Sequence, residues 1–370
     1  MIIGCPKEIK THEYRVGLVP SSVKELISNG HEVLVESSAG EGINYSDEAY
    51  EAAGAKILPD AASVYAQAEM IVKVKEPQAS EYDLLREGQI LFTYLHLAAD
   101  KPQAEALMKS KCIAIAYETV TDEQGLLPLL RPMSEIAGRL SVHVGSSLLQ
   151  RHAGGSGRLI SGVPGVFPAR VSVLGGGVAG FNAARMAVGL EANVTIFERS
   201  QSRMRFLDDY FKGRARIVYS NSENIEQMIP HTDMIIGSVL VPGASAPKLI
   251  TKDMLKKMQP GTVLIDIAID QGGCFETSRP TTHSEPTYIE DGILHYCVAN
   301  MPGAVPLTSA LALNTAVLPY ATLIANQGWQ RALNTNQHLR AGLNVCKGHV
   351  TCREVSQALD LPFRSPSDLL

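Results

Sequence analysis

Four polar residues stand where the sequence could do chemistry: Arg15, Lys75, His96 and Asp270. Lys75, His96 and Asp270 come just after short apolar runs that are typical of buried strands, and Arg15 lies in a polar segment near the N-terminus. In α/β proteins, functional groups gather in the loops that follow the strands. Each residue also has an ordinary explanation, since a strand-end histidine is often only hydrogen bonded and a strand-end aspartate often caps a helix.

Taken together, these residue types suit the oxidation of an amino acid. Arg15 or Lys75 could supply the cation that binds a carboxylate. Histidine is the usual acid/base residue of enzymes near neutral pH, so His96 could take the amine proton and later activate water on an imine. Asp270 could stabilise the cationic imine or a protonated His96. Composition and spacing do not identify the substrate.

The elements that must position these residues alternate between strands and helices. Short, nearly continuous apolar runs are typical of strands buried on both faces of a parallel sheet, and the segments between them have helical apolar spacing, as in 20–29 and 101–110. The runs are 2–3, 33–35, 70–74, 90–92, 113–116, 171–174, 194–197, 234–236, 263–267 and 295–298. Residues 134–149 and the chain from Pro319 onward are also expected to be helical. This alternation predicts an α/β fold.

The strongest single motif is a strand at 171–174 that ends in the pattern GxGxxG. Gly175 permits the tight turn, Gly177 lets the backbone approach a pyrophosphate, and Gly180 allows close packing of helix on strand. An apolar helix follows and is expected to stop at Gly189, after which residues 192–197 form the next strand. The motif therefore predicts a dinucleotide site, with the phosphates at the helix N-terminus.

Glu198 closes that next strand and is expected to accept hydrogen bonds from the adenosine ribose. A 2′-phosphate would meet a like charge there, which favours NAD over NADP, although Arg199 and Arg203 lie nearby and weaken this inference. FAD and S-adenosylmethionine sites share the same glycine pattern, as do ordinary turns.

Composition excludes several other classes. The 370 residues predict two domains, and a net charge of −5 makes nucleic-acid binding improbable. We find no signal-peptide core and no run of about 18 apolar residues, so no membrane span is expected. The six cysteines are far apart, without a CxxC pair, which predicts reduced thiols in a cytoplasmic protein and no structural zinc.

Several longer blocks resemble bacterial alanine dehydrogenases, within the alanine dehydrogenase/transhydrogenase alpha-subunit family, over essentially the whole chain. The blocks are residues 3–10, 13–16, 72–77, 91–98, 132–139, 266–273 and 298–306. The resemblance implies reversible, NAD-dependent oxidative deamination of L-alanine to pyruvate and ammonia. It also implies that Arg15 and Lys75 bind substrate, that His96 and Asp270 form an acid/base pair, and that the subunits assemble as hexamers.

The resemblance further implies a domain plan and a set of NAD contacts. A Rossmann-type NAD-binding domain, residues 133–305, is inserted in a discontinuous substrate domain, residues 1–132 and 306–370, and both are doubly wound. Besides the three glycines, the implied contacts are Ser134, Val178, Glu198, Arg203, Ser220, Val239, Leu240, Ile267, Ala268, Ile269, Asp270, Arg279, Val298, Ala299, Asn300 and Met301.

The chain departs from the family pattern at a few positions. Glu198 stands where aspartate is more usual, and Gly17 replaces an alanine. Some members bind a metal through a glutamate and a late histidine; Glu118 matches the first but Gln327 replaces the second, so no metal is expected. Two alternatives remain: hydride transfer between nicotinamide nucleotides, as in transhydrogenases, and a non-catalytic NAD-binding regulator. Activity on glycine and glyoxylate by the same machinery also stays open.

Overall fold

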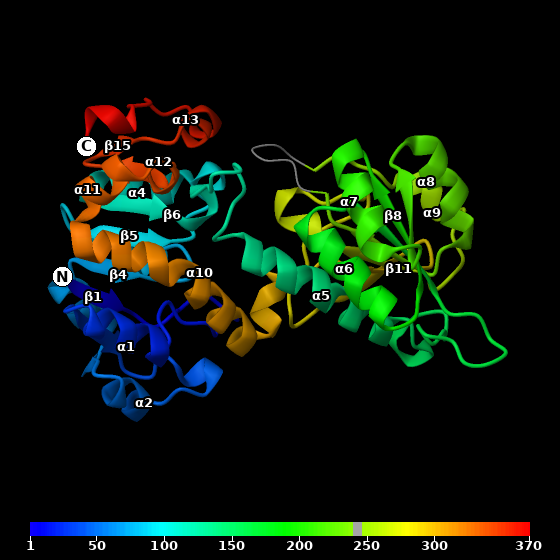
Figure 1. Ribbon diagram of the computed structural model, residues 1–370, viewed down its shortest axis with the longest axis horizontal. Coiled ribbons are helices and arrows are strands. Elements are labelled where there is room, and N and C mark those ends of the chain that lie inside the picture. The colour runs from blue at the N-terminus through cyan, green and yellow to red at the C-terminus, as the bar shows by residue number, and fades with distance from the viewer. Residues whose placement is uncertain (240–245) are drawn as a thin grey trace. The chain divides into compact units, whose positions relative to one another are not determined.

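The computed structural model describes residues 1–239 and 246–370, and the chain divides into two compact units. Unit 1 comprises Met1–Met133 and Val305–Leu370, and unit 2 comprises Ser134–Ala304. The chain therefore leaves unit 1, builds unit 2 and returns. Figure 1 shows the return, because unit 1 contains blue-to-cyan and orange-to-red ribbon.

Unit 1 is built on a sheet with strand order β15-β14-β6-β5-β4-β1-β2-β3. The strands are β1 (Ile2–Cys5), β2 (Glu32–Glu36), β3 (Lys56–Leu58), β4 (Met70–Val72), β5 (Ile90–Thr93), β6 (Ile113–Ala116), β14 (Leu343–Cys346) and β15 (His349–Val350). Neighbours from β3 to β6 are parallel, and the C-terminal β14 adds antiparallel to β6. The order changes direction between β1 and β4, where ligands bind in doubly wound sheets.

Helices connect these strands, as parallel pairing requires. They are α1 (Pro20–Ser28), α2 (Asp47–Ala52), α3 (Ala61–Gln67), α4 (Lys101–Ser110), α10 (Pro306–Gln327), α11 (Trp329–Thr335), α12 (Gln337–Arg340) and α13 (Arg353–Leu359). By length and composition alone, α10 could cross a membrane. However, it packs on α1, and the buried Asn314 amide bonds to Val16 and Val19, so we describe α10 as a core helix.

Unit 2 repeats the arrangement around a second sheet, of order β12-β13-β11-β10-β7-β8-β9. Its strands are β7 (Arg170–Leu174), β8 (Asn193–Glu198), β9 (Ala215–Tyr219), β10 (Met234–Gly237), β11 (Val263–Asp266), β12 (Thr287–Glu290) and β13 (Ile293–Tyr296). Its helices are α5 (Arg131–Leu148), which begins in unit 1, α6 (Val178–Gly189), α7 (Gln201–Phe211), α8 (Ser222–Met228) and α9 (Lys252–Leu255). The order reverses between β7 and β10, beside the glycine motif.

The predicted fold class, two doubly wound α/β domains with the second inserted in the first, is confirmed. Central strands such as β4, β5, β6, β10 and β11 are buried at every residue, which explains their continuous apolar runs. Helices cover both faces, so hydrophobic residues from both sides of each sheet form the cores.

Three predicted boundaries were wrong. The strand in the run 70–74 ends at Val72: Lys73 N and the Val74 carbonyl still bond to Phe92 and Tyr94, but the buried Glu8 carboxylate takes the backbone N–H groups of Val74 and Lys75. The run 295–298 is shifted, since β13 pairs with β12 through a turn in which Asp291 and Gly292 both have positive φ. The last long helix begins at Pro306, not at Pro319, which lies inside it.

Candidate functional site

The carboxyl edge of the unit 1 sheet gathers the predicted substrate-side residues. Arg15 lies in the segment after β1, Lys75 follows β4, His96 follows β5, and Glu118 follows β6. Because β1, β4, β5 and β6 are consecutive neighbours in the sheet, the loops carrying these four residues are neighbours at one edge. Residues spread over more than 100 positions of sequence are thereby brought to one place.

Arg15 is buried and is held by Glu13. Its Nε donates to Glu13 Oε1 at 2.6 Å and its Nη2 to Oε2 at 2.5 Å, a two-pronged ion pair with both side chains almost fully buried. Burial alone would lower the pKa of Arg15, but the Glu13 carboxylate outweighs this effect and raises it. Its Nη1 also lies 3.1 Å from Met133 Sδ. The guanidinium is therefore always charged and fixed in direction.

Lys75 is partly buried beside a charged cluster. Glu8 Oε1 accepts hydrogen bonds from the backbone N–H groups of Val74 at 2.6 Å and Lys75 at 3.2 Å. The buried Lys73 ammonium in turn lies 3.3 Å from Glu8 and 2.9 Å from Glu81. Burial and then the charge of Arg15 lower the pKa of Lys75. Among the described residues, no carboxylate lies within ion-pair distance of the Lys75 ammonium, so it remains available to an anion.

His96 stands at the end of β5 with a half-exposed side chain and a left-handed backbone, φ 49°. The backbone N–H of His96 donates to Glu118 Oε1 at 2.6 Å, and the ring Nδ1 of His96 lies 4.0 Å from the same oxygen. The Tyr94 ring stacks against its imidazole, with centroids 5.8 Å apart and planes 7° apart. An exposed imidazole with a carboxylate behind it is the arrangement that a general base requires.

The glycine motif of unit 2 has the geometry that the sequence predicts. Gly175 has φ +94°, which side chains rarely tolerate. A Cβ on Gly180 would lie 1.8 Å from the Gly175 carbonyl oxygen, so helix and strand pack in contact. A Cβ on Gly177 would meet nothing within 4 Å, and Gly177 is the N-cap of α6 with no side chain bonded there. The helix N-terminus therefore has open space for a phosphate.

Glu198 and Arg203 lie around this glycine turn. The Glu198 carboxylate accepts backbone N–H groups from Gly176 at 2.9 Å, and from Arg199 and Ser200. Arg203 Nε donates to the Gly176 carbonyl at 2.6 Å, and its guanidinium lies over the Phe206 ring. Oε1 accepts the N–H groups of Arg199 and Ser200, whereas Oε2 accepts only that of Gly176 and can accept a further bond from a ribose hydroxyl next to the turn.

The other implied dinucleotide contacts also follow strand ends of unit 2. Ser220 follows β9, Val239 follows β10, and Ile267–Gln271 forms a 3-10 helix directly after β11. Val298, Ala299, Asn300 and Met301 follow β13, and Ser134 lies in α5. Arg279 lies over the Tyr288 ring at 3.9 Å, away from any strand end. Leu240 lies outside the described residues.

Asp270 is an exposed residue of the 3-10 helix after β11. His96 belongs to unit 1 and Asp270 to unit 2, and their pairing stays a prediction. The helix itself is organised by Asp266, whose buried carboxylate accepts bonds from Ala268 N, Cys274 N, Phe275 N and Ser278 Oγ. Within residues 1–239 and 246–370, no group of three or more His, Cys, Asp or Glu side chains could hold a metal ion.

Sequence reasoning missed four acidic residues of these sites: Glu8, Glu13, Glu118 and Asp266. Only Glu13 had a local signal, because its two-residue spacing from Arg15 allows a direct ion pair. Glu8 and Glu118 act on residues 66 and 22 positions away, which only the order of strands brings close. Glu118 was considered solely as a possible metal ligand.

Comparison with known proteins agrees with this geometry. Family models described as "Alanine dehydrogenase/PNT, N-terminal domain" and "Alanine dehydrogenase/PNT, C-terminal domain" match residues 4–137 and 141–353. The chain is 55% identical over 370 residues to an alanine dehydrogenase of Halomonas elongata and 52% identical over 371 residues to alanine dehydrogenase 2 of Staphylococcus aureus. All of this chain and all of each relative are covered.

Solved structures give the same result. The chain matches a structure of L-alanine dehydrogenase with a TM-score of 0.95 and 50% identity, covering 97% of this chain and 99% of the other. It also matches a transhydrogenase from Sinorhizobium meliloti with a TM-score of 0.82 and 23% identity, covering 95% and 100%. At that identity, the second likeness shows the shared fold alone.

Proposed function

Because the chain belongs to the alanine dehydrogenase/PNT family and has alanine dehydrogenase function, we propose that it oxidises L-alanine with NAD through the residues described above. The net reaction converts L-alanine, NAD and water into pyruvate, ammonium, NADH and a proton, and it is reversible. Units 1 and 2 are proposed as the substrate domain and the NAD-binding domain. The observation that carries the proposal is the alignment of Arg15, Lys75 and His96 along adjacent strand ends.

We assign the substrate carboxylate and carbonyl to Arg15 and Lys75. Support comes from the fixed Arg15 guanidinium, which presents a planar donor set, and from the Lys75 ammonium, which has no carboxylate partner among the described residues. Burial and then the charge of Arg15 lower the pKa of Lys75, and an anionic substrate between the two cations would relieve their repulsion.

The proton transfers fall to His96, with Asp270 as its proposed partner. Bound NAD supplies the acceptor for the hydride from the alanine α-carbon. As the hydride leaves, His96 takes one proton from the ammonium group and then releases it to solvent. The neutral imidazole next removes a proton from water, so that the oxygen adds to the iminium carbon, and it returns this proton to the amine nitrogen. Ammonia leaves as the C–N bond breaks. In the reverse direction, the protonated imidazole returns the same protons.

The residues present fit a dinucleotide, and NAD is proposed over NADP. The open N-terminus of α6 at Gly177 would receive the pyrophosphate, and Glu198 would bind the ribose diol. A 2′-phosphate would lie against the Glu198 carboxylate. Val239, Leu240, Arg279, Ile267–Asp270 and Val298–Met301 are proposed as further contacts.

The direct test is absorbance at the NADH band with purified protein, L-alanine and NAD, with glycine, L-serine and NADP in parallel. NADH is expected with L-alanine, and pyruvate plus ammonium should consume it. His96→Ala should abolish turnover while NADH binding persists. Absence of NADH with every amino acid, despite NAD binding, would instead favour the transhydrogenase-like or regulatory alternatives.

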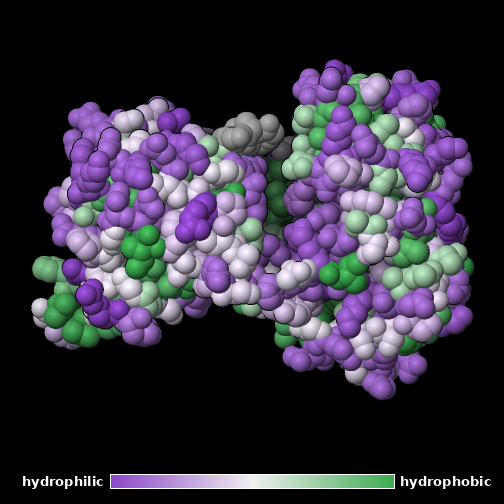
Figure 2. All heavy atoms as spheres, turned by 180° about the vertical axis from the view of Figure 1, so that it is seen from behind, coloured by the Kyte–Doolittle hydropathy of each residue, from purple (hydrophilic) through white to green (hydrophobic). Residues whose placement is uncertain are grey.

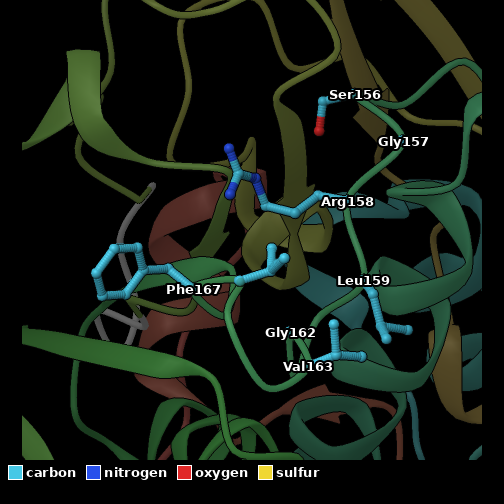
Figure 3. A pocket seen from close by; sticks show the side chains of 8 residues that line it. Ser156, Gly157, Arg158, Leu159, Gly162, Val163 and Phe167 are labelled. Atoms are coloured by element: carbon cyan, nitrogen blue, oxygen red, sulfur yellow. The ribbon is translucent and has the colours of Figure 1, made fainter.

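We also propose that the chain assembles as a homohexamer, with the loop 156–168 of unit 2 as one contact between copies. Val163 and Val166 close a small hairpin over the Pro164-Gly165 turn, and this loop exposes Leu159, Val163, Val166 and Phe167. Phe167 is 88% exposed and points away from Leu159 and Val163, beside a hollow of about 360 Å³ that the same loop lines (Figure 3). Figure 2 shows hydrophobic surface at this end of unit 2.

A loop that carries both a projecting ring and an apolar hollow suits pairing with a second copy of itself. Phe167→Ser is expected to reduce the assembly size measured by sedimentation, whereas Leu126→Ser, an exposed residue of another loop, should leave it unchanged. A monomeric wild-type protein would rule out the hexamer. Smaller assemblies in both variants would instead rule out this loop as the specific contact.

A cytoplasmic role in L-alanine catabolism completes the proposal. All six cysteines are buried and free, as expected of a protein in a reducing compartment. Thiol titration of unfolded protein that was purified without reductant should therefore count all six cysteines as free thiols.

A further inference from the structure

We propose that Glu118 is a positioning residue that holds His96 in its reactive orientation. This inference rests on the proposed function, because it takes His96 as the base. It rests on three independent contacts of one carboxylate with the His96 segment, and on the conformation that these contacts maintain.

The first contacts fix the backbone. Leu95 N lies 3.2 Å from both Glu118 oxygens, and His96 N donates to Oε1 at 2.6 Å. These two amides lie just beyond β5, where the chain turns into the left-handed conformation at His96, with φ 49° and ψ 36°. Residues other than glycine adopt this conformation rarely, so it persists only where neighbours enforce it. Glu118, which is mostly buried, is the carboxylate that does so.

A further contact acts on the ring. Glu118 Oε1 lies 4.0 Å from His96 Nδ1, too far for a hydrogen bond but close enough for its charge to favour a proton on that nitrogen. Nε2 is then left unprotonated and able to accept a proton from substrate.

Tyr94 sets the plane of the His96 imidazole. Its ring stacks on His96, and its hydroxyl donates to the Leu129 carbonyl at 2.7 Å, which locks the tyrosine in place. Tyr117, next to Glu118 in the chain, packs edge-on against Tyr94 with centroids 5.1 Å apart. The segment after β6 therefore supports both the charge and the plane of the base on β5.

Two substitutions separate charge from backbone support. Glu118→Gln keeps the length and one acceptor oxygen but removes the charge, and Glu118→Ala removes both. The matched control is Glu69→Gln: the Glu69 carboxylate accepts the Ile2 N–H at the start of β1, at the opposite edge of the same sheet. Thermal stability and NADH binding report whether each variant is folded.

For Glu118→Gln we expect kcat to fall about 10–100-fold, as for other residues that orient a reactive imidazole, with KM for L-alanine changed less than threefold. Glu69→Gln should keep wild-type kcat. In ¹⁵N-histidine NMR spectra, with the His96 signal assigned by its absence in His96→Ala, the Nδ1-protonated form should dominate in wild type and lose population in Glu118→Gln.

A kcat within twofold of wild type, or an unchanged proton distribution on the ring, would overturn the proposal. Equal losses of stability and activity in Glu118→Gln and Glu69→Gln would also overturn it, because they would indicate structural support alone. If the wild-type enzyme made no NADH from L-alanine, the proposed function would fail, and the NMR comparison would still decide whether Glu118 controls His96.

Discussion

Glu13 and Arg15 form a two-pronged ion pair, with Nε–Oε1 at 2.6 Å and Nη2–Oε2 at 2.5 Å, in which both side chains are almost fully buried. The partners are only two residues apart, so the pair fixes the segment that carries Arg15 and aims the guanidinium. If Arg15 binds the substrate carboxylate, as we propose, substrate binding and local stability both depend on the Glu13 carboxylate.

Glu13→Gln should therefore weaken both properties. Breaking a buried pair by removing one partner costs about 3–5 kcal/mol, since the Arg15 charge stays buried and loses the Glu13 carboxylate. We expect a lower melting temperature and a KM for L-alanine raised at least tenfold. The double variant Glu13→Leu with Arg15→Met should recover stability but not alanine binding. A single variant with wild-type stability and KM would contradict the role given to Glu13.

The proposed role of Lys75 in substrate binding predicts that this binding weakens at alkaline pH. Only the ammonium form binds a carboxylate, and burial together with Arg15 lowers its pKa below the usual range of lysine. As pH rises through that lowered pKa, the charge is lost and affinity for pyruvate should fall. The fall should begin at a lower pH than an ordinary lysine would give.

The measurement is the Kd of pyruvate against pH, with NADH present and ammonium omitted so that no turnover occurs. Lys75→Arg remains charged throughout this range, so its Kd should change little with pH, whatever its absolute value. The same alkaline loss in wild type and Lys75→Arg would show that another group is responsible.

Substitutions of the glycines in the nucleotide turn should separate effects on stability from effects on NADH affinity. Gly180→Ala places a Cβ 1.8 Å from the Gly175 carbonyl, so we expect a loss of stability of about 1–3 kcal/mol. Gly177→Ala meets no protein atom within 4 Å and should fold normally, yet its methyl group would occupy the space of the pyrophosphate. We expect its NADH affinity to fall at least tenfold.

Gly189→Ala is the matched control, because Gly189 is the last residue of the same helix and also has open space around its Cα. It should bind NADH normally and be as stable as wild type, or slightly more so. Chemical denaturation and NADH fluorescence titration measure the two properties. Normal NADH binding by Gly177→Ala would remove the phosphate from this helix N-terminus.

The sequence predicts strands that are buried on both faces, such as β6 and β11, because parallel pairing under two helical layers requires continuous apolar residues. The same pattern does not predict β9, because β9 is an edge strand in which the exposed Arg216 interrupts the apolar run. It also fails at β12, where an antiparallel hairpin replaces the parallel pattern. The Asp291-Gly292 pair was the signal for that hairpin.

The strand-end positions of the candidate residues His96, Lys75 and Glu198 were predictable from the sequence. Their partners were not, because Glu8 and Glu118 make contacts defined by strand order. Adjacency of β5 and β6 brings Glu118 to His96, and adjacency of β1 and β4 brings Glu8 to Lys75. A single sequence, considered without an alignment, does not show which strands are neighbours in the sheet.

Cofactor preference should depend on the charge of Glu198. Its carboxylate accepts the N–H groups of Gly176, Arg199 and Ser200, so truncation to serine would disturb the turn as well as the charge. Glu198→Gln keeps the side-chain length and one acceptor oxygen and removes the charge, so it should disturb the turn less than serine does. With the repulsion gone and with Arg199 and Arg203 close by, the ratio of kcat/KM for NAD to that for NADP should fall at least tenfold.

Glu191→Gln, at the amino end of β8, is the control and should keep the wild-type ratio, because Glu191 stands at the opposite end of the strand that terminates in Glu198. Glu198→Ser should relax the preference too, with an added loss of affinity for both cofactors from the disturbed turn. If Glu198→Gln kept the wild-type ratio, discrimination against the 2′-phosphate would have to arise from groups other than this carboxylate.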